Sequence, residues 1–255
     1  MAWLGGITMV GLCSLGAAMP TKALVVANYE FQNTLSSTIP TAPDLVPFAP
    51  GTYAPAVIGG TPTIVYNFGA NEGLSLDTSG LISDNYTIAA LFSFDSISGY
   101  KKIFDFKNLT SDTGLYTING RLNFYNTGTG GLAVDPGTFF EAVLTRDSTT
   151  DLVSAYLNGA PVFSFTDSSS LGVISGANLL NIFQDDFAVP GEITSGSVAG
   201  LRIFNNVLTD TEVADLDLLT PLGPPPAAVP APLPILGAAA ALGFSRKLRM
   251  RIKTS

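Results

Sequence analysis

Residues 115–125 read LYTINGRLNFY, and this stretch decides the fold class. Apolar and polar residues alternate on both sides of Asn119 and Gly120, which is the pattern of two half-buried strands. Asn-Gly is a preferred pair for a two-residue type I′ turn, because both turn positions need a positive φ. The stretch therefore predicts a β-hairpin.

A second hairpin is predicted where SAYL (154–157) and VFSF (162–165) flank Asn158 and Gly159. Pro161 follows this turn, a place that suits a strand start or an edge strand because proline has no backbone donor. Further strands are predicted over residues 86–94, 102–106, 139–145, 179–183 and 198–204. Since no helical patterns separate these strands, they indicate one all-β antiparallel sandwich.

One short helix is predicted near the C-terminal end of the sandwich. Thr209 and Glu212 have the spacing of a capping box, and Leu208 and Val213 have the spacing of a hydrophobic staple. The apolar pattern continues beyond Val213, so the helix is expected to run until Pro221 ends it.

Three segments are predicted to lack regular structure. Residues 34–63 are rich in Pro, Ser, Thr and Ala, which indicates a long loop or an irregular edge. Residues 126–131 (NTGTGG) are expected to form a flexible loop rather than a phosphate cradle, because no basic residue or helix start follows them. Residues 220–228 are rich in Pro and Ala and predict an extended linker.

Charge and composition exclude several classes of function. The body of the chain, residues 24–222, contains all 20 acidic residues and six basic ones, so its net charge is −14. Such an acidic domain repels nucleic acid, and we expect no nucleic-acid partner. The chain has no His, which excludes Ser-His-Asp catalysis and imidazole zinc sites. Its one cysteine, Cys13, precedes the body, so no disulfide is expected within the body.

The N-terminal segment has the features of a secretory signal peptide. An apolar run over residues 3–19 is followed by Pro20, Thr21, Lys22 and Ala23. Thr21 and Ala23 are small enough for the −3 and −1 positions, so cleavage is expected after Ala23, with Ala27 as the alternative. Residues 1–23 are therefore predicted to be removed during export.

The C-terminal segment combines a proline break, an apolar run and a basic end. Residues 233–244 are apolar, and they are too few to span a bilayer unless flanking residues contribute. The terminal cations favour a cytoplasmic location for this end. The break is Val229, Pro230, Ala231 and Pro232, and the cations include Arg246, Lys247, Arg249 and Arg251.

Together, residues 229–253 resemble the PEP-CTERM sorting signal, in which a Val-Pro-Glu-Pro motif precedes a hydrophobic helix and an Arg-rich end. Ala231 stands where that signal has Glu. The resemblance implies an exported protein of the cell envelope or extracellular matrix, with an exosortase-type processing enzyme as partner. It also implies membrane attachment through this segment before processing.

Residues 64–219 resemble a laminin-G-type, concanavalin A-like jelly roll, within a predicted domain of residues 24–219. The resemblance rests on YTIAALFSF (86–94), YLNG (156–159) and SGSVAGLRIFNNVL (195–208), which runs into the predicted capping box. It implies a binding or adhesion module for glycans or proteins, dependent on calcium in some members.

The same resemblance argues against catalysis. Glycosidases of this class carry paired carboxylates in a Glu-x-Asp-x-x-Glu type of segment, which this chain lacks. Glu212 with Asp215 or Asp217 comes closest, but these residues belong to the predicted helix. The chain is therefore not expected to be an enzyme.

Asp185, Asp186 and Glu192 are the candidate metal ligands. They follow a predicted strand and supply the carboxylate oxygens that Ca²⁺ prefers. The alternative is that Asp185 and Asp186 are solvated loop acids or partners of Arg202 or Lys101. A second acidic turn, residues 147–151, is explained by Asx-turn hydrogen bonds.

Four aromatic residues of the predicted strands admit two interpretations. Tyr100, Tyr116, Phe124 and Tyr125 either form a platform on which a sugar stacks or belong to the core, and we favour the core.

Two functions accordingly remain open. The exported domain binds an extracellular polysaccharide or surface protein, or it is a structural matrix component without a small ligand.

Overall fold

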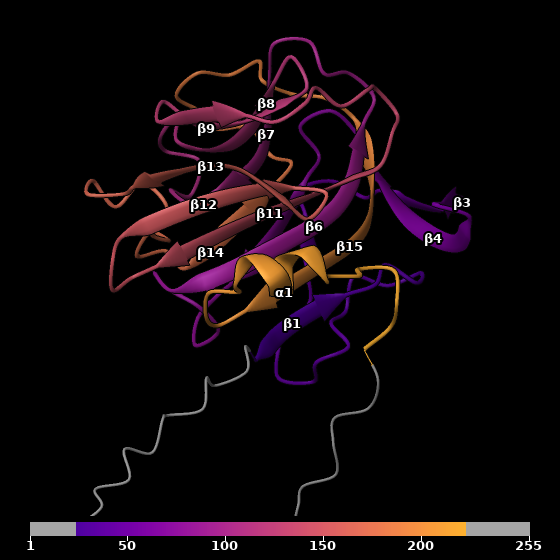
Figure 1. Ribbon diagram of the computed structural model, residues 1–255. Coiled ribbons are helices and arrows are strands. Elements are labelled where there is room, and N and C mark those ends of the chain that lie inside the picture. Colours follow the sequence, from indigo (N-terminus) through magenta and orange to yellow (C-terminus); the bar gives the residue numbers. More distant parts are fainter. Residues whose placement is uncertain (1–23, 223–255) are drawn as a thin grey trace, which may run out of the picture. The chain divides into compact units, whose positions relative to one another are not determined.

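The computed structural model describes residues 24–222, which form two antiparallel sheets packed against each other (Figure 1). Within these residues, sheet A has the strand order β13-β12-β11-β6-β15-β4-β3, and β1 also pairs with β15. Sheet B has the order β10-β9-β8-β7-β14-β5-β2. The prediction of an all-β sandwich is confirmed.

The strands of sheet A are β1 (Val25–Tyr29), β3 (Thr52–Ile58), β4 (Thr61–Phe68), β6 (Tyr86–Phe94), β11 (Phe140–Asp147), β12 (Leu152–Leu157), β13 (Ala160–Thr166) and β15 (Gly196–Phe204). Those of sheet B are β2 (Val46–Pro47), β5 (Leu74–Asp77), β7 (Tyr100–Asp105), β8 (Gly114–Ile118), β9 (Arg121–Tyr125), β10 (Gly128–Gly130) and β14 (Leu179–Ile182).

Both Asn-Gly turns are present as predicted. Asn119 and Gly120 have φ values of 48° and 78°, and they join β8 to β9. Asn158 and Gly159 have φ values of 49° and 76°, and they join β12 to β13. Since β13 is the outermost strand of sheet A, Pro161 lies on an edge strand, where its missing donor costs no ladder hydrogen bond.

The main core lies between the two sheets. Alternate residues of β6, among them Ile88 and Phe92, face alternate residues of sheet B such as Leu122 and Phe124. Phe183 follows β14 and stacks on Phe68 with ring centroids 4.5 Å apart. This alternation buries the inner face of each sheet in the core, and the outer face of each sheet points away from it.

The outer face of sheet A is covered by α1 (Asp210–Ala214) and the segments beside it (Figure 1). Thr209 and Glu212 form the predicted capping box. A second apolar cluster joins this cover to the sheet, and it contains Ala89, Val143, Tyr156, Phe204, Leu208, Val213 and Leu218. The helix itself ends at Ala214, well before Pro221, because the chain turns there to pack Leu218 on the sheet.

The prediction of a loop over residues 34–63 is partly wrong, because β3 and β4 form a hairpin around Gly59 and Gly60. In such a hairpin the residues beside the turn exchange hydrogen bonds, and alternate residues point their backbone groups away from the partner strand. Pro55 and Pro62 occupy these outward positions, so neither proline interrupts the ladder.

The expected loop over residues 126–131 also differs, since Gly128–Gly130 is strand β10. This strand lies against β13, and a Cβ built on Gly130 would come within 2.6 Å of the backbone oxygen of Val162. The glycines therefore serve close packing of two strands.

Among residues 24–222, no helix is long and apolar enough to cross a membrane. The predicted signal segment (1–23) with its cleavage site at Ala23 lies outside the described residues, as does the sorting segment (229–253). The latter includes Val229, Pro230, Ala231, Pro232, Arg246, Lys247, Arg249 and Arg251.

Candidate functional site

Sheet B has an outer face that α1, the one helix within residues 24–222, leaves uncovered. Leu115, Leu122 and Phe124 point into the core, so the residues that alternate with them point outward. The outward set on the central strands is polar and aromatic, and it comprises Tyr100, Lys102, Tyr116, Asn123, Tyr125 and Asn181.

A groove of about 330 Å³ opens on this face where β9 turns into β10. Its two aromatic members, Tyr100 and Tyr125, are half-buried, and their rings lie nearly perpendicular with centroids 5.7 Å apart. The other members are Asn123, Asn126, Thr127, Gly128 and Thr129. The groove thus offers aromatic surface beside amide and hydroxyl groups, and no charged residue lines it.

The aromatic residues singled out from the sequence divide between the two interpretations. Phe124 belongs to the core, and Tyr116 is fully buried, with its ring edge-to-face to Tyr100 and the ring centroids 5.7 Å apart. Tyr100 and Tyr125 line the groove instead. The core interpretation is therefore correct for Phe124 and for the buried ring of Tyr116, and wrong for Tyr100 and Tyr125.

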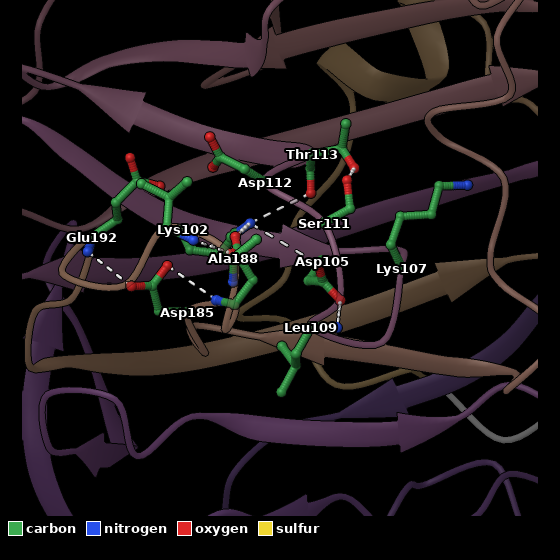
Figure 2. A network of polar contacts seen from close by, with 12 residues as sticks. Lys102, Asp105, Lys107, Leu109, Ser111, Asp112, Thr113, Asp185, Ala188 and Glu192 are labelled. Atoms are coloured by element: carbon green, nitrogen blue, oxygen red, sulfur yellow. Dashed lines mark hydrogen bonds and ion pairs between the residues drawn. The ribbon is translucent and has the colours of Figure 1, made fainter.

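Beside the groove lies a cluster of buried and half-buried acids. The acids gather around Lys102 (Figure 2). The Nζ atom of Lys102 lies 2.7 Å from Oδ2 of Asp186 and 4.0 Å from Oδ2 of Asp105. It also lies 4.2 Å from the centre of the Tyr116 ring, a cation–π contact that links the cluster to the aromatic residues. Lys102 is only 2% exposed, so this ammonium group is held away from solvent.

Two further acids complete this Lys102 cluster. Asp112, Asp186 and Glu192 each bring a carboxylate oxygen within 4.8 Å of the others. The hydroxyl of Tyr116 donates to Oδ1 of Asp112 at 2.9 Å. Four carboxyl groups thus share a cluster with one ammonium group, and such an excess of negative charge favours protonation of one acid or a bound cation.

The loop that carries Asp186 and Glu192 is held by carboxylate–backbone hydrogen bonds. Asp185 accepts from the backbone N–H groups of Gly191 and Glu192, both at 2.8 Å. Asp186 accepts through Oδ1 from Ala188 and Val189, at 2.8 and 2.9 Å. These contacts fix the loop geometry.

The structure brings the carboxylates of Asp186 and Glu192 together and adds Asp112, which the sequence reasoning missed. Asp185 is not part of this carboxylate group, because its Oδ2 accepts from the backbone N–H groups of Gly191 and Glu192. Asp186 binds neither Lys101 nor Arg202, the two partners considered from the sequence. The partner of Asp186 is Lys102. Lys102 pairs with Tyr116 across β7 and β8, so both side chains lie on the outer face of sheet B, where the Asp186 loop also lies. Calcium binding by this loop stays a prediction, and the ammonium of Lys102 competes with a cation for Asp186.

The pKa of two acids in the Lys102 cluster moves upward. Burial raises the pKa of Glu192 to about 7, and the nearby charges of Asp112 and Asp185 add to the rise. Burial likewise raises the pKa of Asp105, against the hydrogen bond from the backbone of Leu109 and the charge of Lys102. Glu192 therefore exchanges a proton near neutral pH.

The remaining acids considered from the sequence have structural contacts. Glu212 accepts from the backbone N–H of Thr209 at 2.9 Å within the capping box. Asp147 accepts from the backbone of Thr149 at 2.8 Å, as expected of an Asx turn. Asp151 binds Arg146 at 2.9 Å.

Comparison with known proteins agrees with this architecture. A laminin-G-type family model, described as the concanavalin A-like lectin/glucanases superfamily, matches residues 68–214. No curated protein matches the chain significantly.

Solved structures with a similar fold include domain 4 of AbnA, an extracellular GH43 arabinanase from Geobacillus stearothermophilus, in complex with arabinotriose. The TM-score is 0.57 at 19% identity, over 76% of this chain and 98% of that one.

A structure of botulinum neurotoxin type C gives a TM-score of 0.55 at 12% identity, over 75% of this chain. Cell entry of that toxin depends on interaction with two ganglioside molecules. The binding domain of botulinum neurotoxin DC in complex with rat synaptotagmin II gives 0.54 at 13% identity, over 74% of this chain. The chain spans 50% of each neurotoxin chain.

The family match covers more than half of the chain and agrees with the resemblance noted over residues 64–219. The chain therefore belongs to the concanavalin A-like lectin/glucanases superfamily.

Proposed function

We propose that this protein is an exported binding module that holds a glycan in the groove of Tyr100 and Tyr125. The observation that carries the proposal is the lining of the groove, where two half-buried tyrosine rings adjoin four amide or hydroxyl side chains. A sugar has an apolar C–H face and a rim of hydroxyl groups, so it matches aromatic surface flanked by neutral hydrogen-bonding groups.

Three larger depressions match a sugar less well. One of about 530 Å³ runs along the β3–β4 hairpin and is lined mainly by Pro, Ala, Val and Ile side chains. Another, of about 580 Å³, lies beside β12 and β13, and apolar atoms make up most of its lining. The third, of about 400 Å³, is lined by Tyr156 and Phe163 with two serines and the charged Asp210. None of the three pairs two tyrosine rings with amide groups, so the groove on sheet B remains the better candidate.

The structural neighbours support both a glycan and a protein as ligand classes. The arabinanase domain was solved with arabinotriose, and the type C neurotoxin depends on gangliosides. The neurotoxin DC domain was solved with synaptotagmin II. The small, uncharged groove of this chain favours the glycan.

We also propose that the protein is sorted to the cell envelope or extracellular matrix. The support is the sequence of its two ends, a signal-like segment at residues 1–23 and a PEP-CTERM-like segment at residues 229–253. An exosortase-type enzyme is the proposed processing partner, and the envelope supplies polysaccharides as ligands.

A glycan array on the purified protein tests the binding proposal. We expect binding to a defined set of glycans, and a loss of affinity of about tenfold in Tyr125→Ala and in Tyr100→Ala. Removing one ring removes apolar contact worth about 1–2 kcal/mol. Tyr53→Ala is the matched control, because Tyr53 is a half-buried tyrosine of sheet A outside the groove.

If no glycan binds to the folded protein, with or without calcium, the binding proposal fails and the structural matrix role remains. If binding is seen but both groove variants bind as the wild type does, the ligand lies elsewhere on the protein.

Glycoside hydrolysis is the second candidate function. One observation favours it: Glu192, with its pKa near 7, lies close to Asp112 and Asp186, as an acid and a nucleophile do in retaining glycosidases. The pairing of Asp186 with Lys102 opposes it, because a nucleophile needs access to the substrate. Release of reducing ends from a bound glycan, abolished in Glu192→Gln, would establish this activity.

A further inference from the structure

One amide in the groove has an unused acceptor. Asn123 is 6% exposed, and among residues 24–222 its Oδ1 atom has no hydrogen-bond partner. Asn123 lies on the outward face of β9, between Tyr116 of β8 and Thr129 of β10, and it forms part of the groove wall. A buried acceptor without a donor costs free energy, so a donor supplied by a ligand is favoured here.

The orientation of this amide is fixed by its other end. The Nδ2 atom of Asn123 donates to the backbone oxygen of Gly128 at 3.0 Å and to Oγ1 of Thr129. A carbonyl oxygen only accepts, so rotating the amide by 180° would place two acceptors together. Oδ1 therefore stays the unpaired end. It is buried at the wall of the groove, so a ligand that uses it must displace the side chains that cover it.

We infer that the groove selects a neutral glycan, and that Asn123 determines specificity by accepting a hydrogen bond from one sugar hydroxyl. This inference rests on the proposed function of the same groove. The hydroxyl donates to Oδ1 while a ring of the Tyr100–Tyr125 pair contacts the apolar face of the sugar.

The charge pattern excludes acidic sugars. None of the seven residues that line the groove is charged, and the body as a whole carries −14. A uronate or sulfate group would enter without a cationic partner and against the field of the protein. It would also bring a second acceptor toward Oδ1 of Asn123 instead of a donor.

The test compares neutral and acidic trisaccharides on the full-length protein. The neutral probes are cellotriose, xylotriose, mannotriose and arabinotriose, and the acidic probe is trigalacturonate. For the neutral sugar that binds most tightly, the affinities of its monodeoxy analogues are then measured, each analogue lacking one hydroxyl group. We expect one deoxy position to lower affinity about 10- to 100-fold, because it leaves the buried acceptor unpaired.

The same series on Asn123→Ala separates recognition from structure. In that variant the critical deoxy analogue and its parent should bind equally, since the acceptor is gone. A merely structural role for Asn123 would weaken both sugars alike and keep the difference between them. Thr129→Val is the matched control: it removes one partner of Nδ2, leaves Oδ1 in place, and should keep the deoxy penalty.

Four results would overturn the inference. Tighter binding of trigalacturonate than of every neutral probe would leave a binding module with a different ligand class. A deoxy series without a sensitive position, or a penalty that persists in Asn123→Ala, would remove Asn123 from recognition. If none of the probes binds and the glycan array is also blank, the proposed function itself fails.

Discussion

Glu192 and Asp186 lie in one cluster, yet their pKa values move in opposite directions. Burial raises the pKa of Glu192 to about 7, and no cation lies in hydrogen-bond contact with it among the described residues. Burial also acts to raise the pKa of Asp186, but the hydrogen bonds from Lys102 and from the backbone of Val189 lower it overall. One lysine thus keeps one acid charged and leaves the other close to titration.

This difference predicts how stability depends on pH. A carboxyl group whose folded pKa is raised favours folding at low pH, and that contribution is lost as the pH rises through the unfolded and then the folded pKa. For Glu192 the window runs from about 4.5 to about 7. We therefore expect Glu192→Gln to be more stable than the wild type at pH 8, and the difference between the two proteins to be much smaller at pH 5.

Urea unfolding at the two pH values measures this effect, and Asp186→Asn is the control from the same cluster. A lowered pKa gives stability that is present above the unfolded pKa, near 3.9, and is lost only in acid. Asp186→Asn should therefore be destabilised at both pH 5 and pH 8. A difference between Glu192→Gln and the wild type that is the same at both pH values would contradict the assignment.

Only some residues of the candidate site could be predicted from the sequence. Asp185, Asp186 and Glu192 are close in the chain, so their proximity follows from one loop. Asp112 comes from the segment before β8, and only the pairing of β7 with β8 brings it to the cluster. The acceptor of Asn123 depends on the position of β10, which no local pattern in the sequence reveals.

At the scale of elements, the turns were more informative than the strand composition. Both Asn-Gly pairs gave correct hairpins because their positive φ values are a local requirement. The β3–β4 hairpin was missed because Pro55 and Pro62 are usually signs of a loop. A proline fits a strand only where its backbone nitrogen points away from the partner strand. The direction of each nitrogen follows from the pairing register of β3 with β4, which the sequence does not give.

Strand β10 gives a prediction about close packing. A Cβ on Gly130 would lie 2.6 Å from the backbone oxygen of Val162, which cannot move without shifting β13. Gly130→Ala should therefore destabilise the fold by about 1–3 kcal/mol and weaken any ligand held in the groove. Gly176→Ala is the matched control, because nothing lies within 4 Å of the added carbon. Urea unfolding of both variants measures the cost, and equal stabilities would show that β10 does not pack on β13 in this way.

At the scale of the whole molecule, the fold was predictable because several segments occur in the order that the family requires. The strand at residues 86–94, the second Asn-Gly hairpin and the closing strand with its capping box span most of the body. The two ends raise a different matter, since the proposal about the destination of the protein rests on them. Their signals are read from composition and position in the chain.

Deleting residues 233–255 separates the destination of the protein from its fold. The two apolar clusters of the sandwich are built from residues between Ala27 and Leu218, so the truncated protein should unfold at the temperature of the full-length protein. Its location should change, because the truncation removes the apolar run of residues 233–244 and five cations. We expect the truncated protein in the culture medium, and the full-length protein in the envelope fraction or shortened at its C-terminus.

Cell fractionation and mass determination of the mature protein measure these outcomes. Replacing Arg246, Lys247, Arg249 and Arg251 by Gln keeps the apolar run and tests the cations alone. If these cations hold the C-terminal end on the cytoplasmic side, the charge variant should also fail to be retained or processed. A truncated protein that fractionates as the full-length protein does would contradict a sorting role for the segment, whatever the glycan array shows for the groove on sheet B.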